Sequence, residues 1–248
     1  LIDVAYTFSC PSQDEISDFP ENYRNYYVSV FSDHRTPFVS ALSIIEQICQ
    51  TLNVDAISYI CQLLQQKPGE NSIFVISSIY PSLVDNLTQD SETAVNIIEF
   101  LTVYCNQCLP MLNDASIPDR VKYTIFWMIG ECITAFQIEP IVEIIGGLLQ
   151  SLVQIQPDGS KQLAIPDPLI MIKFSFASNI ALALFENFPG IQLPEEAITL
   201  FLLCHNTTFS TSSLKLLESL ISISPNEEMQ VAIVTECIEY LNYFFSPG

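Results

Sequence analysis

The residues whose types and spacing could support chemistry begin with two cysteines, Cys105 and Cys108, that are separated by two residues. A redox pair of this spacing follows a β-strand in a βαβ unit, whereas this pair lies near the end of an expected helix. A zinc site needs a second pair of ligands, and the two histidines, His34 and His205, are isolated from each other. We therefore interpret Cys105 and Cys108 as packing thiols, and we expect no metal and no cofactor.

A nucleophile and a base are adjacent at Cys204 and His205. Adjacent residues of a helix project about 100° apart, so these side chains face different directions and cannot form a dyad with each other. The glutamate pairs at 195–196 and 227–228 follow prolines and are typical of the first turn of a helix, not of an acid–base pair. No glycine-rich phosphate loop and no hydrolase motif occurs. We predict that the chain is not an enzyme; a site assembled only in three dimensions is the remaining alternative.

The elements that would position any such residues are predicted to be helices. Apolar residues recur at helical spacing, as at Phe38, Leu42 and Ile45, and no comparable set of alternating β-runs appears. Prolines stand at or just before several of the expected helix starts, where the missing N–H costs nothing. An amphipathic stretch over 16–31 precedes helices expected at 38–52, 57–64, 72–87, 91–109, 118–136, 140–155, 168–188, 194–206, 212–223 and 226–245.

These helices pair as hairpins that begin near residues 36, 71, 118, 167 and 210. Intervals of about 35–50 residues are those of HEAT and armadillo repeats, in which stacking buries the apolar face that a single hairpin leaves open. We therefore predict an all-α fold, a right-handed α-solenoid of HEAT-like helical hairpins with about ten to eleven helices. We expect residues 1–248 to form a single solenoid segment of a longer chain.

The composition is that of a folded protein in a reducing compartment. Of the 248 residues, 49% are hydrophobic and 15% are charged, which excludes disorder. The most apolar windows, 133–155 and 163–185, are interrupted by prolines and charged residues, so we expect no membrane insertion. Most of the eight cysteines lie in apolar helical runs and are expected to be free thiols. We predict a cytoplasmic or nuclear location.

The formal net charge of −20 narrows the class of partner. The eight basic residues are scattered, whereas a nucleic-acid binder needs clustered positive charge, so we expect no nucleic-acid binding. An acidic surface favours a basic protein cargo or peptide, although like-charge repulsion also keeps an apolar protein soluble. On the expected concave face, we predict that Glu143 and Glu239 contact the partner.

Two further features have a structural and a functional interpretation. Trp127, the sole tryptophan, is either a partner-binding anchor or a core residue between repeats, and we favour the core. Gly146 and Gly147 lie in the middle of an expected helix, where glycine is unfavourable. We expect a kink or a close helix contact there; close approach of a ligand is the alternative.

Two passages resemble the karyopherins of the importin-β family. Residues 18–28 are similar to an acidic, aromatic and arginine-containing stretch of their middle repeats, and residues 121–149 resemble a HEAT hairpin with a Trp-x-x-Gly-Glu helix. The resemblance implies a nuclear transport receptor that binds basic cargo, a small GTPase and phenylalanine-glycine repeats. The same Trp-x-x-Gly-Glu helix also resembles the large chains of clathrin adaptors. The rival hypothesis is therefore a cytoplasmic assembly scaffold, such as an adaptor large chain or a phosphatase or cohesin regulatory subunit.

Overall fold

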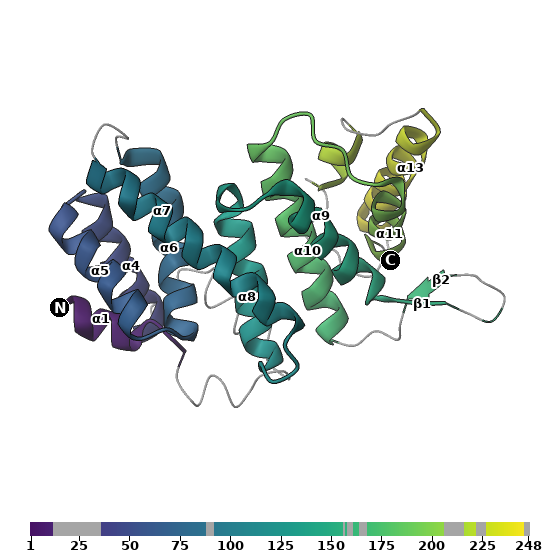
Figure 1. The fold of residues 1–248 in the computed structure, drawn as a ribbon. Helices are drawn as coiled ribbons and strands as arrows, with labels where there is room; N and C mark the ends of the chain where they lie inside the picture. The colour runs from purple at the N-terminus through teal and green to yellow at the C-terminus, as the bar shows by residue number, and fades with distance from the viewer. Residues whose placement is uncertain are drawn as a thin grey trace. The chain divides into compact units, whose positions relative to one another are not determined.

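The computed structural model describes residues 1–11, 36–87, 92–155, 157, 161–163, 168–205, 216–221 and 227–245 (Figure 1). In this part of the chain the protein is helical apart from one short hairpin, which confirms the predicted all-α class. Two compact units are present, Leu1–Phe136 (unit 1) and Gln137–Gly248 (unit 2). A right-handed superhelix and a single domain over 1–248 stay predictions. The amphipathic stretch expected at 16–31 lies outside the described residues.

Unit 1 consists of helices stacked in two layers (Figure 1). Helices α1, α4, α6 and α8 pack against one another in that order, and α5 packs against α7 in the second layer. Contact between every second helix is the arrangement of stacked helical hairpins. The helices are α1 (Ile2–Phe8), α4 (Pro37–Gln50), α5 (Val54–Gln66), α6 (Glu70–Asn86), α7 (Glu92–Cys108) and α8 (Asp119–Glu131), with 3₁₀ turns η1 (Leu109–Asn113) and η2 (Ile133–Ala135).

Local sequence explains where these helices begin. The Thr36 hydroxyl accepts a hydrogen bond from the Val39 N–H at 3.2 Å, and Pro37 occupies the first position of α4. The Asn53 side chain likewise accepts from the Ala56 N–H, at 3.0 Å, at the start of α5. Such caps satisfy N–H groups that a helix leaves unpaired at its start.

Helix α6 is the centre of unit 1 and is buried around most of its circumference between α4, α7 and α8. Its Phe74 ring contacts Phe38 of α4, with centroids 4.8 Å apart, and Trp127 of α8, with centroids 5.4 Å apart. A line of three aromatic rings therefore joins three successive helices of one layer. Aromatic packing of this kind contributes more than the buried area alone.

Several predicted boundaries differ from the structure. The helix expected over 118–136 ends at Glu131 and continues as the 3₁₀ turn η2. The helix expected over 140–155 ends at Gln150, and residues 153–155 form a strand instead. Helix α1 was not predicted at all. An apolar pattern continues through each of these breaks, so hydrophobic periodicity alone does not show where the backbone hydrogen bonding changes.

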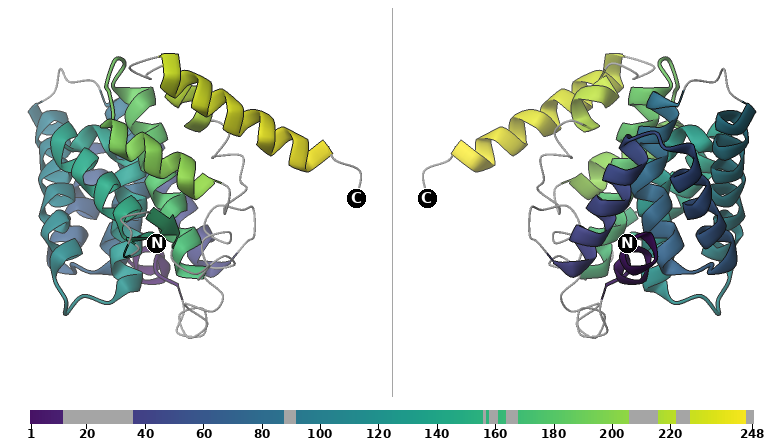
Figure 2. Two further views of the ribbon diagram at one scale, coloured as in Figure 1. Left: turned by 90° about the vertical axis from the view of Figure 1, so that its right-hand side faces the viewer. Right: turned by 90° about the vertical axis from the view of Figure 1, so that its left-hand side faces the viewer.

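Unit 2 contains α9 (Ile138–Gln150), α10 (Pro168–Asn187), α11 (Glu195–His205) and α13 (Glu227–Phe245). Helix α9 packs against α10 and α11. Strands β1 (Val153–Ile155) and β2 (Lys161–Leu163) pair antiparallel, with Val153 opposite Leu163. Figure 2 shows α13, in yellow, extending past the other described helices of this unit.

The glycines of α9 do not serve a close helix contact, which was one of the two expected explanations; the other, a kink, stays a prediction. A Cβ atom built on Gly146 or on Gly147 meets no atom within 4 Å. Gly147 is exposed and Gly146 is half-buried. Both positions therefore have room for a side chain, and nothing packed against them requires glycine.

Replacing Gly146 and Gly147 together with alanine is expected to raise the free energy of unfolding by about 1–2 kcal/mol, because each helical glycine costs about 0.5–1 kcal/mol relative to alanine. Urea unfolding followed by circular dichroism measures the change. Gly190→Ala is the control, since Gly190 has a φ of 88° that side chains rarely adopt, and it is expected to destabilise the protein. A double variant no more stable than the parent would contradict the prediction.

Candidate functional site

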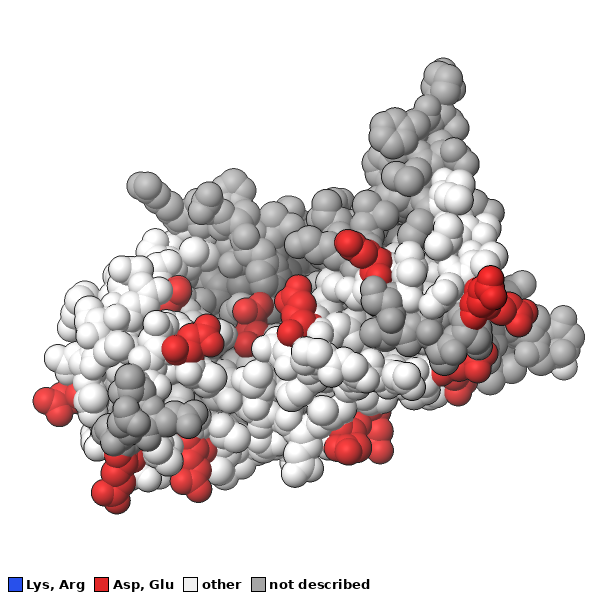
Figure 3. All heavy atoms as spheres, turned by 90° about the horizontal axis from the view of Figure 1, so that it is seen from above, with Lys and Arg blue, Asp and Glu red and all other residues white. Residues whose placement is uncertain are grey.

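Carboxylates dominate the exposed charge of unit 2. Lys173 is the only basic side chain described in this unit, and it is half-buried. Figure 3 shows one face of the molecule, on which described Asp and Glu side chains are spread and no described Lys or Arg is visible. Among the described side chains of unit 2, the exposed carboxylates are Glu139, Glu143, Glu186, Glu195, Glu196, Glu218, Glu227 and Glu228.

Several of these groups are placed by the way their helices begin. Glu139, the pair at 195–196 and the pair at 227–228 lie in the first turns of α9, α11 and α13, as predicted for the two pairs. The positive end of the helix dipole stabilises a carboxylate at this position. Glu143 lies one turn beyond Glu139, on the same face of α9, because residues four apart are neighbours on a helix. Helix α9 therefore buries Ile141 and Ile145 while it presents two carboxylates to solvent.

Some carboxylates of unit 1 accept hydrogen bonds from side chains of the same unit. The Tyr59 hydroxyl donates to Asp3 at 2.9 Å, and this hydrogen bond to the carboxylate raises the pKa of Tyr59. The Ser116 hydroxyl and N–H donate to Asp114 at 2.7 and 2.8 Å, which lowers the pKa of Asp114. Unit 1 also exposes Lys67. Unit 2 is therefore the better candidate for an acidic binding surface.

The three residues predicted to contact a partner occupy different environments. Glu143 is exposed, whereas the side chain of Glu239 lies outside the described residues, although its backbone belongs to α13. Trp127 is 9% exposed and packs on Phe74, so it offers little surface to a partner. The binding-anchor role of Trp127 stays a prediction. The burial of Trp127 agrees with the alternative interpretation as a core residue.

The Trp-x-x-Gly-Glu segment has a local structural role in α8. The indole Nε1 of Trp127 donates to Glu131 Oε1 at 3.1 Å, one helical turn away. The Glu131 residue as a whole is exposed to solvent. Desolvation of its carboxyl group by the surrounding protein nevertheless raises the pKa of Glu131, and the hydrogen bond from Trp127 opposes this shift.

The cysteine pair is part of a buried group of thiols. Cys105 and Cys108 lie on α7, and Cys132 follows α8. Burial raises the pKa of Cys108 to about 12, and burial together with neighbouring Cys105 raises the pKa of Cys132. Since the thiolate is the nucleophile and the metal ligand, the raised pKa of Cys108 and Cys132 disfavours both roles for these two thiols. Within the described residues no group of three or more His, Cys, Asp or Glu side chains is arranged to hold a metal ion.

The remaining candidates for catalysis are not brought together by the described structure. His34 and the side chains of Cys204 and His205 lie outside the described residues. A hollow of about 270 Å³ is lined by Tyr6, Thr7, Lys67, Pro68, Gly69 and Asn71. Its polar groups mostly bond to one another: the Tyr6 hydroxyl donates to the Lys67 carbonyl oxygen at 2.7 Å, and the Asn71 amide donates to the Tyr6 carbonyl oxygen at 2.9 Å.

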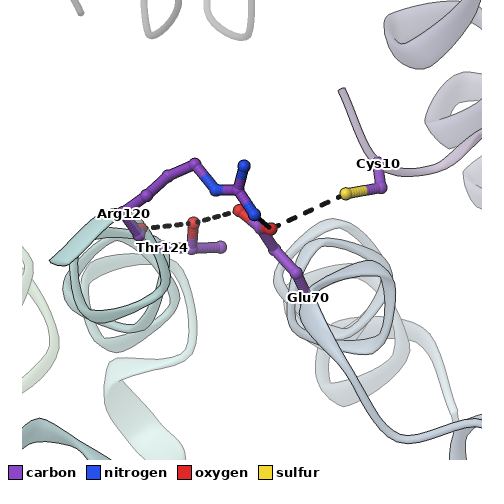
Figure 4. Close-up of polar contacts among 4 residues, drawn as sticks. All are labelled: Cys10, Glu70, Arg120 and Thr124. Carbon is purple, nitrogen blue, oxygen red and sulfur yellow. Dashed lines mark hydrogen bonds and ion pairs between the residues drawn. The ribbon is translucent and has the colours of Figure 1, made fainter. Parts of the chain in front are cut away.

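A largely buried ion pair joins α6 to α8 and was not predicted from the sequence. The Arg120 guanidinium is in direct contact with the Glu70 carboxylate, whose side chain is only 8% exposed (Figure 4). The Thr124 hydroxyl lies 3.3 Å from Glu70 Oε1 and 3.1 Å from the Arg120 carbonyl oxygen, and Cys10 Sγ lies 3.8 Å from Glu70 Oε2. The Nε of Arg120 is buried and has no hydrogen-bond partner among the described residues.

This cluster connects the segment after α1 to α6 and α8, so its location indicates a role in holding unit 1 together. Glu70 and Arg120 are 50 residues apart in the chain. From the sequence alone, a glutamate at the start of a helix, such as Glu70, is expected to be a solvated residue of the first turn. No signal of spacing or composition could therefore have paired the two.

In comparisons with known proteins, no family model, no curated protein and no solved structure matches this chain. The resemblance to karyopherins and to clathrin-adaptor large chains therefore stays a prediction. Among the described helices, none is both long enough and apolar enough to cross a lipid bilayer.

Proposed function

We propose that this chain is a non-enzymatic helical-repeat scaffold that binds a basic segment of a partner protein through the exposed carboxylates of unit 2. The observation that carries the proposal is the charge balance of that unit. Its described surface exposes carboxylates on α9, α10, α11 and α13, whereas Lys173 is its only described basic side chain. A surface of one sign raises the rate at which oppositely charged ligands associate.

The architecture supports binding rather than catalysis. Stacked helices present side chains along an extended surface, which is the way in which repeat proteins hold partners. Two of the buried thiols among the described residues, Cys49 and Cys108, have a pKa that burial raises to about 12. At neutral pH a thiol of that pKa is about one part in 10⁵ thiolate, which is too little for nucleophilic catalysis.

The more specific form of the proposal is a nuclear transport receptor of right-handed superhelical shape, shuttling between cytoplasm and nucleus with basic cargo and a small GTPase. It rests on the resemblance of residues 18–28 and 121–149 to karyopherins and on the acidic surface, which suits basic import signals. The rival form is a cytoplasmic assembly scaffold, which the Trp127 to Glu131 segment fits equally well. Affinity capture with the GTPase fixed in each nucleotide state separates the two, because only a transport receptor should change its partners with that state.

Binding of a lysine-rich peptide to the purified chain is expected to weaken steeply as salt rises from about 50 to 300 mM, because exposed charges are screened beyond about 8 Å at physiological ionic strength. Fluorescence anisotropy with a labelled peptide measures the affinity, and stopped flow measures the rates. Charge reversal of Glu139 and Glu143 to lysine should slow association more than it speeds dissociation.

The matched control is charge reversal of Glu92 and Glu99, two exposed carboxylates on α7 of unit 1. This variant carries the same net charge as the Glu139 and Glu143 variant, so any difference between them reflects location. Equal loss in both variants would show attraction by net charge alone. Binding that does not depend on salt would contradict the proposal.

A further inference from the structure

Helix α13 carries an apolar stripe that the described structure leaves open. Val231 is 59% exposed, Val234 is 42% exposed and Ile238 is 52% exposed. Their spacing of three and four residues places all three on one face of the helix. On the opposite face, Ile233 is fully buried. The helix is therefore covered at Ile233 and presents a second apolar side to solvent.

The chemistry around this stripe identifies what would cover it. Residues 216–248 contain no Lys, Arg or His, and they include five glutamates. Two of them, Glu227 and Glu228, are exposed in the first turn of α13. An occupant therefore has to supply apolar side chains for the stripe and positive charge for the surrounding carboxylates.

A second copy of this chain does not meet these requirements. Each copy has a formal net charge of −20, and pairing two α13 helices would bring two sets of carboxylates together. Like charges brought close in an interface cost several kcal/mol. A basic amphipathic helix meets both needs, because its apolar residues at helical spacing can face the stripe while its Lys and Arg side chains reach the glutamates.

We propose that the face of α13 formed by Val231, Val234 and Ile238 docks a basic amphipathic helix of a partner protein. The inference rests on the function proposed above and names its partner more closely: a helix with one apolar face flanked by Lys and Arg. Apolar contact then contributes a part of the affinity that does not weaken as salt rises. The glutamates orient the basic helix and increase the rate of association. The part of the affinity that does not depend on salt distinguishes binding at the α13 site from attraction by net charge alone.

The test uses the full chain and two synthetic peptides of about 18 residues, long enough to form a marginal helix. Both contain the same leucines and lysines. In the first the leucines recur at helical spacing on one face, and in the second the order is shuffled so that no apolar face forms. Fluorescence anisotropy is measured at physiological salt, and the unmodified chain is expected to bind the first peptide at least about tenfold more tightly than the second.

The stripe is removed by Val231→Ser, Val234→Ser and Ile238→Ser together, which creates no cavity because these side chains are exposed. The triple variant is expected to bind the amphipathic peptide at least about tenfold more weakly, down to the affinity of the shuffled peptide. The control is Val95→Ser with Val103→Ser on α7, two valines of similar exposure, at 45% and 48%. This control variant should bind like the unmodified chain.

The outcomes distinguish this inference from the proposed function. Salt-dependent binding that the triple variant retains in full would overturn the α13 site and leave the proposed function standing. Absence of binding by the unmodified chain to either peptide would overturn both. Sedimentation velocity is measured alongside, and a dimer that the triple variant loses would make a second copy the occupant and overturn the inference. Circular dichroism confirms that each variant remains helical.

Discussion

Replacing Trp127 with alanine is expected to lower the free energy of unfolding by about 3–5 kcal/mol, the range for removing a large aromatic side chain from a core. Trp127 is 9% exposed and packs against Phe74, which is itself fully buried between α4 and α8. The deletion leaves a cavity beside the central helix of unit 1. Urea or thermal unfolding followed by circular dichroism measures the loss.

Trp127→Phe separates the contribution of packing from that of the hydrogen bond. Phenylalanine keeps an aromatic ring against Phe74 but loses the bond from Nε1 to Glu131. We expect this variant to lose about 1–2 kcal/mol, because the hydrogen bond is partly exposed and the ring volume is largely retained. An unfolding midpoint that does not change in Trp127→Ala would place the residue at the surface and favour the binding-anchor interpretation.

Replacing Arg120 with methionine is expected to destabilise unit 1 by about 3–5 kcal/mol, because it leaves a buried carboxylate without its counter-charge. The Glu70 side chain is only 8% exposed, and the Thr124 hydroxyl and the Cys10 thiol are among its remaining neighbours. Neither of these two groups carries a positive charge. Denaturant unfolding at constant ionic strength measures the effect.

The double variant Glu70→Gln with Arg120→Met is expected to recover most of that loss, since a neutral pair of similar volume removes the buried charge. The double-mutant cycle reports the coupling between the two positions. Lys122→Met, which removes the other described cation of α8, is the matched control and should change stability by no more than about 0.5 kcal/mol. A loss in Arg120→Met no larger than in this control would show that the ion pair is solvated.

The helices were predictable where apolar spacing and capping residues agree. Helices α4, α6 and α13 lie within a few residues of their expected ranges, because a threonine, glycine or proline marks each start and the periodicity continues to each end. A close helix contact at the glycine pair of α9 was expected wrongly, since sequence shows that Gly146 and Gly147 lie inside a helix but not that the space beside them is open.

What could not be predicted depends on residues far apart in the chain. Helix α1 has only seven residues, too few for a periodic signal, and it is held by tertiary bonds such as that from Tyr6 to the Lys67 carbonyl oxygen. The pairing of Glu70 with Arg120 likewise needs α6 and α8 to be adjacent first. The acidic character of the surface was evident from composition, whereas the open stripe on α13 needed the burial of its opposite face to be known.

The order in which unit 1 packs also bears on its biosynthesis. Among the described elements, α1, α4, α5, α6, α7 and α8 pack extensively against other helices of unit 1, which ends at Phe136. The apolar surfaces of the central helix α6 can therefore be covered as soon as α8 has left the ribosome, before unit 2 has emerged. Domains that fold as units do so from the N-terminus during translation, and contacts between successive elements form quickly. A nascent chain of this protein would thus expose the buried faces of its central helix only for about the time needed to translate from α6 to α8.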